Sequence, residues 1–150
     1  MPRTDNLIDD FQKDHSELLG LMRTFHGAIA SSNKSEANEA LNRIDSMANS
    51  HFSFEETYFY PRLQRLVREI TGRLHNDQEA MREFICKSRS VLAKDRMSKN
   101  DLDSLLAMIP KLSKFFEECG KIAFLAERFD DEEKKYLYKR FKECSKKRIS

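Results

Sequence analysis

The chain has 150 residues, the size of one ordinary domain, so we expect a single domain over residues 1–150. Hydrophobic residues make up 39% and charged residues 35%, with only 4 Gly and 3 Pro. This mixture excludes collagen-like and low-complexity chains, and 11 Phe argue against disorder. Lys and Arg together number 27 against 25 Asp and Glu, and a net charge of +2 is too small to predict a nucleic-acid partner.

Hydropathy and cysteine content indicate the cellular compartment in which the protein is expected. No apolar run exceeds the five residues of segment 122–126, so the sequence predicts no membrane span. The first residues contain no hydrophobic signal segment, which predicts a cytoplasmic protein. Cys86, Cys119 and Cys144 are odd in number and form no CxxC pair. We therefore expect reduced thiols rather than disulfides or a zinc site.

The first half of the chain predicts two long amphipathic helices, because its apolar residues recur at intervals of three and four. The first begins near Thr4 or Asp5 and continues to about residue 30. The second begins at Asn33, which has capping-box spacing to Glu36, or at Ser35. Proline lacks a backbone N–H, so Pro61 should end or kink this helix.

The second half predicts two further long helices and a short last one. The third runs from about residue 63 to 92, and the fourth begins near Asp101. Pro110 lies inside the fourth, so we expect a kink or a fresh helix start there. The last begins at Asp130, which has capping-box spacing to Glu133. No segment alternates like a strand, and the whole predicts an all-α, antiparallel up-down four-helix bundle with a short C-terminal helix.

Four polar side chains interrupt the apolar stripes of the first three helices. His15 and His51 lie inside their stripes, Glu55 follows His51 by one turn, and His75 lies at the edge of the third stripe. Because a helix rises by a fixed distance per residue, residues equally far from a turn share a height in the bundle. This predicts three imidazoles and one carboxylate in one layer. Such ligands suit iron, manganese or zinc, and helical bundles hold iron pairs in this way.

The pattern resembles the hemerythrin-like (HHE cation-binding) domain family. The matching segments, within about residues 11 to 143, are Asp14-His15, the HFSFEE motif at 51–56 with the Tyr60-Pro61 pair after it, Leu74-His75, and the acidic segment 129–133. The resemblance implies a four-helix bundle around a non-haem iron centre, usually di-iron, with histidine and carboxylate ligands. It also implies a small ligand (O2, NO or peroxide) and a role as sensor, store, or stress or repair protein.

The fourth helix departs from the family pattern, which normally repeats His-x-x-x-Glu there. No histidine follows the one in the third helix, and two registers are open: Glu117 or Glu133 supplies the carboxylate. Height favours Glu117, because the layer should meet the fourth helix near residues 115–122. Ser113 then stands where the family has its histidine, and the kink at Pro110 must turn both side chains inward.

The predicted metal ligands are His15, His51, Glu55, His75 and Glu117. This set is one imidazole short of a usual di-iron site. The site is therefore weakened or mononuclear, or Glu79 completes it, or it has lapsed and the domain is a regulatory or interaction scaffold.

Two further residues have plainer interpretations. Cys119 faces the seam near this layer, and an inert buried thiol is favoured over a ligand. His26 lies three turns beyond His15, too far to share its metal, and is predicted to be a core or end-layer histidine.

Overall fold

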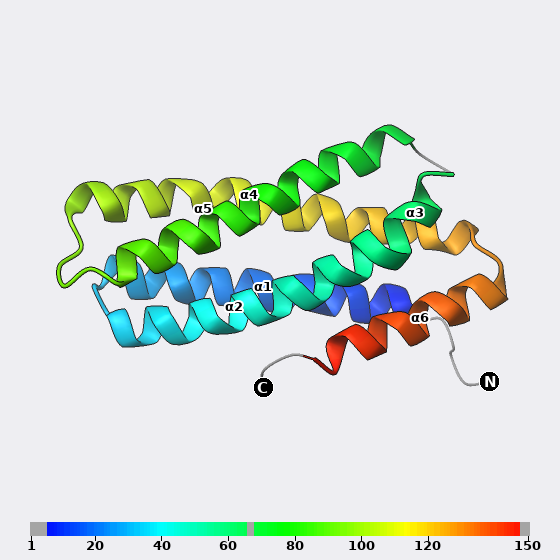
Figure 1. Ribbon diagram of the computed structural model, residues 1–150, viewed down its shortest axis with the longest axis horizontal. Helices are drawn as coiled ribbons and strands as arrows, with labels where there is room; N and C mark the ends of the chain where they lie inside the picture. The colour runs from blue at the N-terminus through cyan, green and yellow to red at the C-terminus, as the bar shows by residue number, and fades with distance from the viewer. Residues whose placement is uncertain (1–5, 66–67, 148–150) are drawn as a thin grey trace.

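Four long helices form an antiparallel up-down bundle in the computed structural model, which describes residues 6–65 and 68–147 (Figure 1). They are α1 (Asn6–Ala30), α2 (Lys34–Phe54), α4 (Arg68–Leu92) and α5 (Lys99–Ile122). Each of α1 and α4 packs against both α2 and α5, which closes the bundle around one central seam. No strand occurs in the described ranges, and the predicted fold class is confirmed.

Shorter elements join and cover these helices. A π-helical turn, η1 (Glu55–Phe59), and α3 (Tyr60–Leu63) follow α2, and the 3₁₀ segment η2 (Ala123–Arg128) follows α5. The last helix, α6 (Asp131–Ser145), doubles back and packs along α2 and α1 (Figure 1). The predicted short C-terminal helix is therefore a fifth packing element that covers one side of the bundle.

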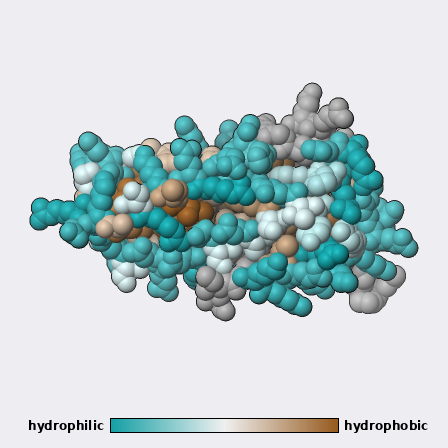
Figure 2. All heavy atoms as spheres, viewed as in Figure 1, coloured by the Kyte–Doolittle hydropathy of each residue, from teal (hydrophilic) through white to brown (hydrophobic). Residues whose placement is uncertain are grey.

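The seam is filled with aromatic and aliphatic side chains. Among the described residues, seven phenylalanines are less than 2% exposed: Phe11, Phe25, Phe52, Phe54, Phe59, Phe84 and Phe116. Burying one such ring is worth about 1.5–3 kcal/mol. The face seen in Figure 2 is mostly hydrophilic, with apolar residues showing between the charged ones, as expected of amphipathic helices. No helix in the described ranges has the length and hydropathy that crossing a membrane requires.

Two of the predicted helix caps are present. The side chain of Asn33 accepts a hydrogen bond from the Glu36 backbone N–H at 3.1 Å. Asp130 does the same for the Glu133 N–H at 2.8 Å. Each cap satisfies one of the N–H groups that the first turn of a helix leaves without a partner. The cap predicted at Thr4 or Asp5 lies outside the described residues.

Pro61 and Pro110 act differently. Before Pro61 the helix widens into the η1 turn, where the Tyr60 N–H bonds to the Glu55 carbonyl five residues earlier. Pro61 then occupies the first turn of α3, where its missing N–H costs nothing. Pro110 lies inside α5, which is continuous from Lys99 to Ile122. A fresh helix start at Pro110 is therefore wrong.

Replacing the cap residue should destabilise the fold measurably. Asn33→Ala removes the acceptor for the Glu36 N–H, and we expect a loss of about 1 kcal/mol in the free energy of unfolding. Ser35→Ala, an exposed position in the same first turn, should change it by less than about 0.5 kcal/mol. Urea unfolding followed by circular dichroism measures both. Equal losses in the two variants would contradict the assignment of Asn33 as the cap.

Candidate metal centre

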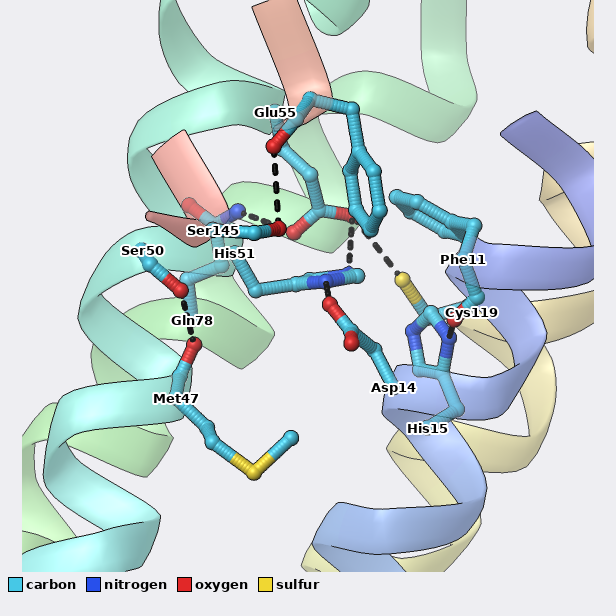
Figure 3. Close-up of polar contacts among 11 residues, drawn as sticks. Phe11, Asp14, His15, Met47, Ser50, His51, Glu55, Gln78, Cys119 and Ser145 are labelled. Carbon is cyan, nitrogen blue, oxygen red and sulfur yellow. Dashed lines mark hydrogen bonds and ion pairs between the residues drawn. The ribbon is translucent and has the colours of Figure 1, made fainter. Parts of the chain in front are cut away.

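Five buried polar side chains meet in the central seam of the bundle (Figure 3). His15 comes from α1, His51 from α2, Glu55 from the start of η1, Gln78 from α4 and Cys119 from α5. None of the five is more than 4% exposed. Burying a polar group without a partner costs free energy, so the partners of each group determine what the cluster is able to do.

The two histidines are held in the same way. His15 Nδ1 lies 2.7 Å from the Phe11 carbonyl oxygen, and His51 Nδ1 lies 3.0 Å from the Asp14 carboxylate. A carbonyl and a carboxylate only accept, so each Nδ1 carries the proton and each Nε2 keeps its lone pair. Neither Nε2 has a hydrogen-bond partner in the structure. The ring centroids are 4.6 Å apart, and the ring planes are nearly perpendicular.

Burial keeps His15 neutral. Burial, and next the neighbouring His51, lower the pKa of His15 to about 3. Uncharged imidazole with a fixed tautomer is the form that binds metal ions.

Glu55 lies at the centre of the hydrogen-bond network. Its Oε1 accepts a bond from Gln78 Nε2 at 2.9 Å, and its Oε2 accepts one from the Cys119 thiol at 3.1 Å. The same Oε2 is 3.6 Å from His51 Nε2, beyond hydrogen-bond distance. Tyr60 completes the group: its hydroxyl is 3.2 Å from Gln78 Nε2 and bonds to Glu55. Burial, and next the charge of Glu55, raise the pKa values of both Tyr60 and Cys119 well above their usual range, so both are protonated donors.

The donor atoms are spaced for a single ion. One ligand atom from each of His15, His51 and Cys119 lies within 4.8 Å of the others. Metal bonds to nitrogen and sulfur are about 2.0–2.3 Å long, so two ligands of one ion are at most about 4.6 Å apart. Small side-chain movements would therefore bring all three onto one ion, with Glu55 Oε2 beside them.

Aromatic rings enclose the cluster. Phe11 lies with its ring centroid 4.7 Å from that of His15 and 4.3 Å from that of His51. Phe116 of α5 is 6.0 Å from His15, and Phe141 of α6 is 6.3 Å from His51. These rings exclude water, so electrostatic interactions inside the cluster are stronger than in solvent.

His75 does not join the cluster. Its side chain is exposed, whereas Leu74 and Gln78 of the same helix are buried in the seam. Successive residues of a helix point about 100° apart, so the residue after Leu74 turns away from the centre although its height is correct. Glu79, the predicted substitute, is also exposed and pairs with Arg82 at 2.5 Å. Gln78 was not among the predicted site residues. Its position in the apolar stripe, one turn after Leu74, was the feature of the sequence that could have indicated it.

Glu117 is also exposed, so the expected inward turn after Pro110 does not occur. Ser113, which should turn inward with it, is only half-buried. The polar layer nevertheless meets α5 within the predicted range 115–122, at Cys119. Cys119 lies about 200° around the helix from Glu117. The fourth helix therefore contributes a thiol where the sequence analysis expected a carboxylate.

The alternative register does not supply the carboxylate either. Glu133 forms ion pairs with Arg62 at 3.2 Å and with Arg65, at the α3–α6 corner. His26, predicted to be a core or end-layer histidine, is exposed.

Comparison with known proteins identifies one family. The model of the hemerythrin HHE cation binding domain matches residues 5–139 of the 150-residue chain. No curated protein and no solved structure matches the chain. The match includes every residue of the cluster.

The network around Glu55 gives a prediction for stability. Gln78→Leu keeps the side-chain volume roughly but removes the N–H that bonds to the buried carboxylate, and we expect a loss of about 1–3 kcal/mol in the free energy of unfolding. Asn76→Leu, at an exposed position on the same helix, is the matched control and should cost less than about 0.5 kcal/mol. Chemical unfolding of the metal-free proteins measures both. A Gln78→Leu protein as stable as the control would show that this hydrogen bond contributes nothing.

Proposed function

We propose that this chain, which belongs to the hemerythrin HHE cation-binding domain family, binds iron in the centre of its bundle through His15, His51 and Glu55. The observation that carries the proposal is the pair of buried imidazole Nε2 atoms that face one cluster and have no hydrogen-bond partner.

The chemistry of these residues fits a metal ion. A buried polar atom without a partner costs about 1–3 kcal/mol, and an ion between the two Nε2 atoms would remove this cost for both. The Nδ1 atoms are bonded to a carbonyl and to the Asp14 carboxylate, which is how metal-binding histidines are usually oriented. Imidazole with carboxylate suits iron, and the family match supports a cation.

The surroundings suit a small, uncharged ligand. Iron at this position would supply a site where O2, NO or peroxide binds. Phe11, Phe116 and Phe141 keep bulk water out, and Gln78 and Tyr60 hold Glu55 in place by hydrogen bonds. Aromatic walls favour small uncharged ligands over charged ones, because burying a charge away from water is costly. We therefore assign a role as a sensor, store or stress protein for one of these molecules.

A second function, a metal-free scaffold, has its own supporting observation. Glu55 accepts bonds from Gln78, Cys119 and Tyr60, so its carboxylate is satisfied without a metal. The exposure of His75 and Glu117 also leaves fewer ligands in the seam than the sequence predicted. Metal content separates the two functions.

The freshly purified protein, or the protein reconstituted with Fe²⁺ without oxygen, should retain metal in a near-stoichiometric amount. Metal that binds only the folded state stabilises it, by about 2.7 kcal/mol at a concentration one hundred times Kd, so chelation should lower Tm. His51→Ala should abolish both the bound metal and this difference in Tm. His75→Ala, at an exposed position, should change neither. Metal analysis and thermal unfolding check these outcomes; negligible metal in the wild type would favour the scaffold.

The ligand class has a separate test. Addition of NO to the anaerobic ferrous protein should produce new visible absorption and a paramagnetic signal, because NO bound to Fe²⁺ forms a complex that absorbs visible light and has unpaired electrons. The metal-free protein treated with NO is the control. Visible absorption measured after exposure to O2 and to peroxide shows which of the three ligands the protein binds. No response to any of the three would contradict this part of the proposal.

A further inference from the structure

We infer that the centre holds a single metal ion and that the Cys119 thiolate is its fourth ligand, rather than a pair of ions bridged by carboxylates. This inference rests on the proposed function, since it concerns the same site. It follows from the different partners of the two Glu55 oxygens and from the side chains that surround them in the seam.

The two carboxylate oxygens of Glu55 have different neighbours. Oε2 lies beside His51 Nε2 at 3.6 Å and the Cys119 sulfur at 3.1 Å. Oε1 accepts the Gln78 N–H at 2.9 Å, and Tyr60 also donates to this carboxylate. A carboxylate that bridges two ions through both of its oxygens offers one oxygen to each ion. Here Oε1 already accepts the amide N–H of Gln78, so a second ion at this oxygen would compete with that hydrogen bond.

Among the described side chains of α4, none that is fully buried at this level is a ligand for a second ion, and the carboxylate of Asp77 is only half-buried. The buried seam residues of α4 at this level are Leu74 and Gln78, one apolar and one a neutral amide. His75, the imidazole of this helix, is exposed. Among the described residues the structure contains one group with metal-binding spacing, His15, His51 and Cys119. These observations favour one ion.

Cys119 has the position of a ligand. Its sulfur lies within 4.8 Å of one ring nitrogen of His15 and one of His51. The Nε2 atoms of both rings are unpartnered, and both side chains are at least nine-tenths buried. With Glu55 Oε2, the donors number four: two nitrogens, one oxygen and one sulfur, a set that suits tetrahedral coordination. Binding replaces the S–H bond with a sulfur–metal bond, and the proton passes to the buffer.

Titration of the full-length protein with Co²⁺ tests both parts of the inference. Cobalt bound by a thiolate has a sulfur-to-metal charge-transfer band in the near ultraviolet, and four-coordinate cobalt has strong visible bands. We expect both to rise together and to stop at one equivalent. Cys119→Ser should lose the near-ultraviolet band and keep visible bands of bound cobalt. Cys144→Ser, at a second buried free thiol, is the matched control and should keep both.

A measurement on the wild type avoids dependence on the folding of the variant. X-ray absorption of the Zn²⁺-loaded protein should show one sulfur neighbour at about 2.3 Å with nitrogen and oxygen neighbours at about 2.0–2.2 Å. The absence of sulfur, or a near-ultraviolet band that persists in Cys119→Ser, would overturn the thiolate ligand. A titration that ends at two equivalents would overturn the single ion. Each of these three results would leave the proposed function unaffected. A protein that binds neither Co²⁺ nor Fe²⁺ would contradict both the proposed function and the inference.

Discussion

The burial of His51 is the constraint on which the rest of the structure depends. An imidazole that is 1% exposed needs partners, and α1 supplies one through the Asp14 carboxylate, 3.0 Å from Nδ1. This contact fixes the height of α1 against α2 and brings His15 beside His51, with ring centroids 4.6 Å apart. The requirement to pair one buried ring therefore sets the register of two helices. It also directs the two free nitrogen atoms to the same place.

The π-helical turn at Glu55–Phe59 extends this arrangement to the far side of the cluster. In a regular α-helix, residues five apart point about 140° away from each other, so Glu55 and Tyr60 would lie on different faces. The wider turn brings them closer in angle, and both side chains reach Gln78 of α4. A π turn is less stable than a regular turn and is frequent at functional sites. The turn begins at Glu55, four residues after His51.

The C-terminal helix has a part in the site as well as in the fold. Phe141 of α6 packs near His51 and Phe54, so this helix completes the apolar wall around the polar cluster. At its other end, the Asp130 cap and the pairing of Glu133 with Arg62 fix where α6 begins. The acidic segment that resembles a family motif therefore helps to close the site without supplying a ligand.

The sequence by itself determined the helices, their order, two caps and the height of the buried polar layer. These depend on local spacing: the capping of α2 by Asn33 involves residues three apart, and a constant rise per residue sets heights. It also identified His15, His51 and Glu55, because polar residues in the middle of an apolar stripe are conspicuous. Only the tertiary structure decided which residues of α4 and α5 face the centre. One residue of shift rotates a side chain by about 100°, so the choice between His75 and Gln78, or between Glu117 and Cys119, depends on how each helix is rotated about its axis. Packing against three neighbours sets that rotation, and no local pattern in one helix records it.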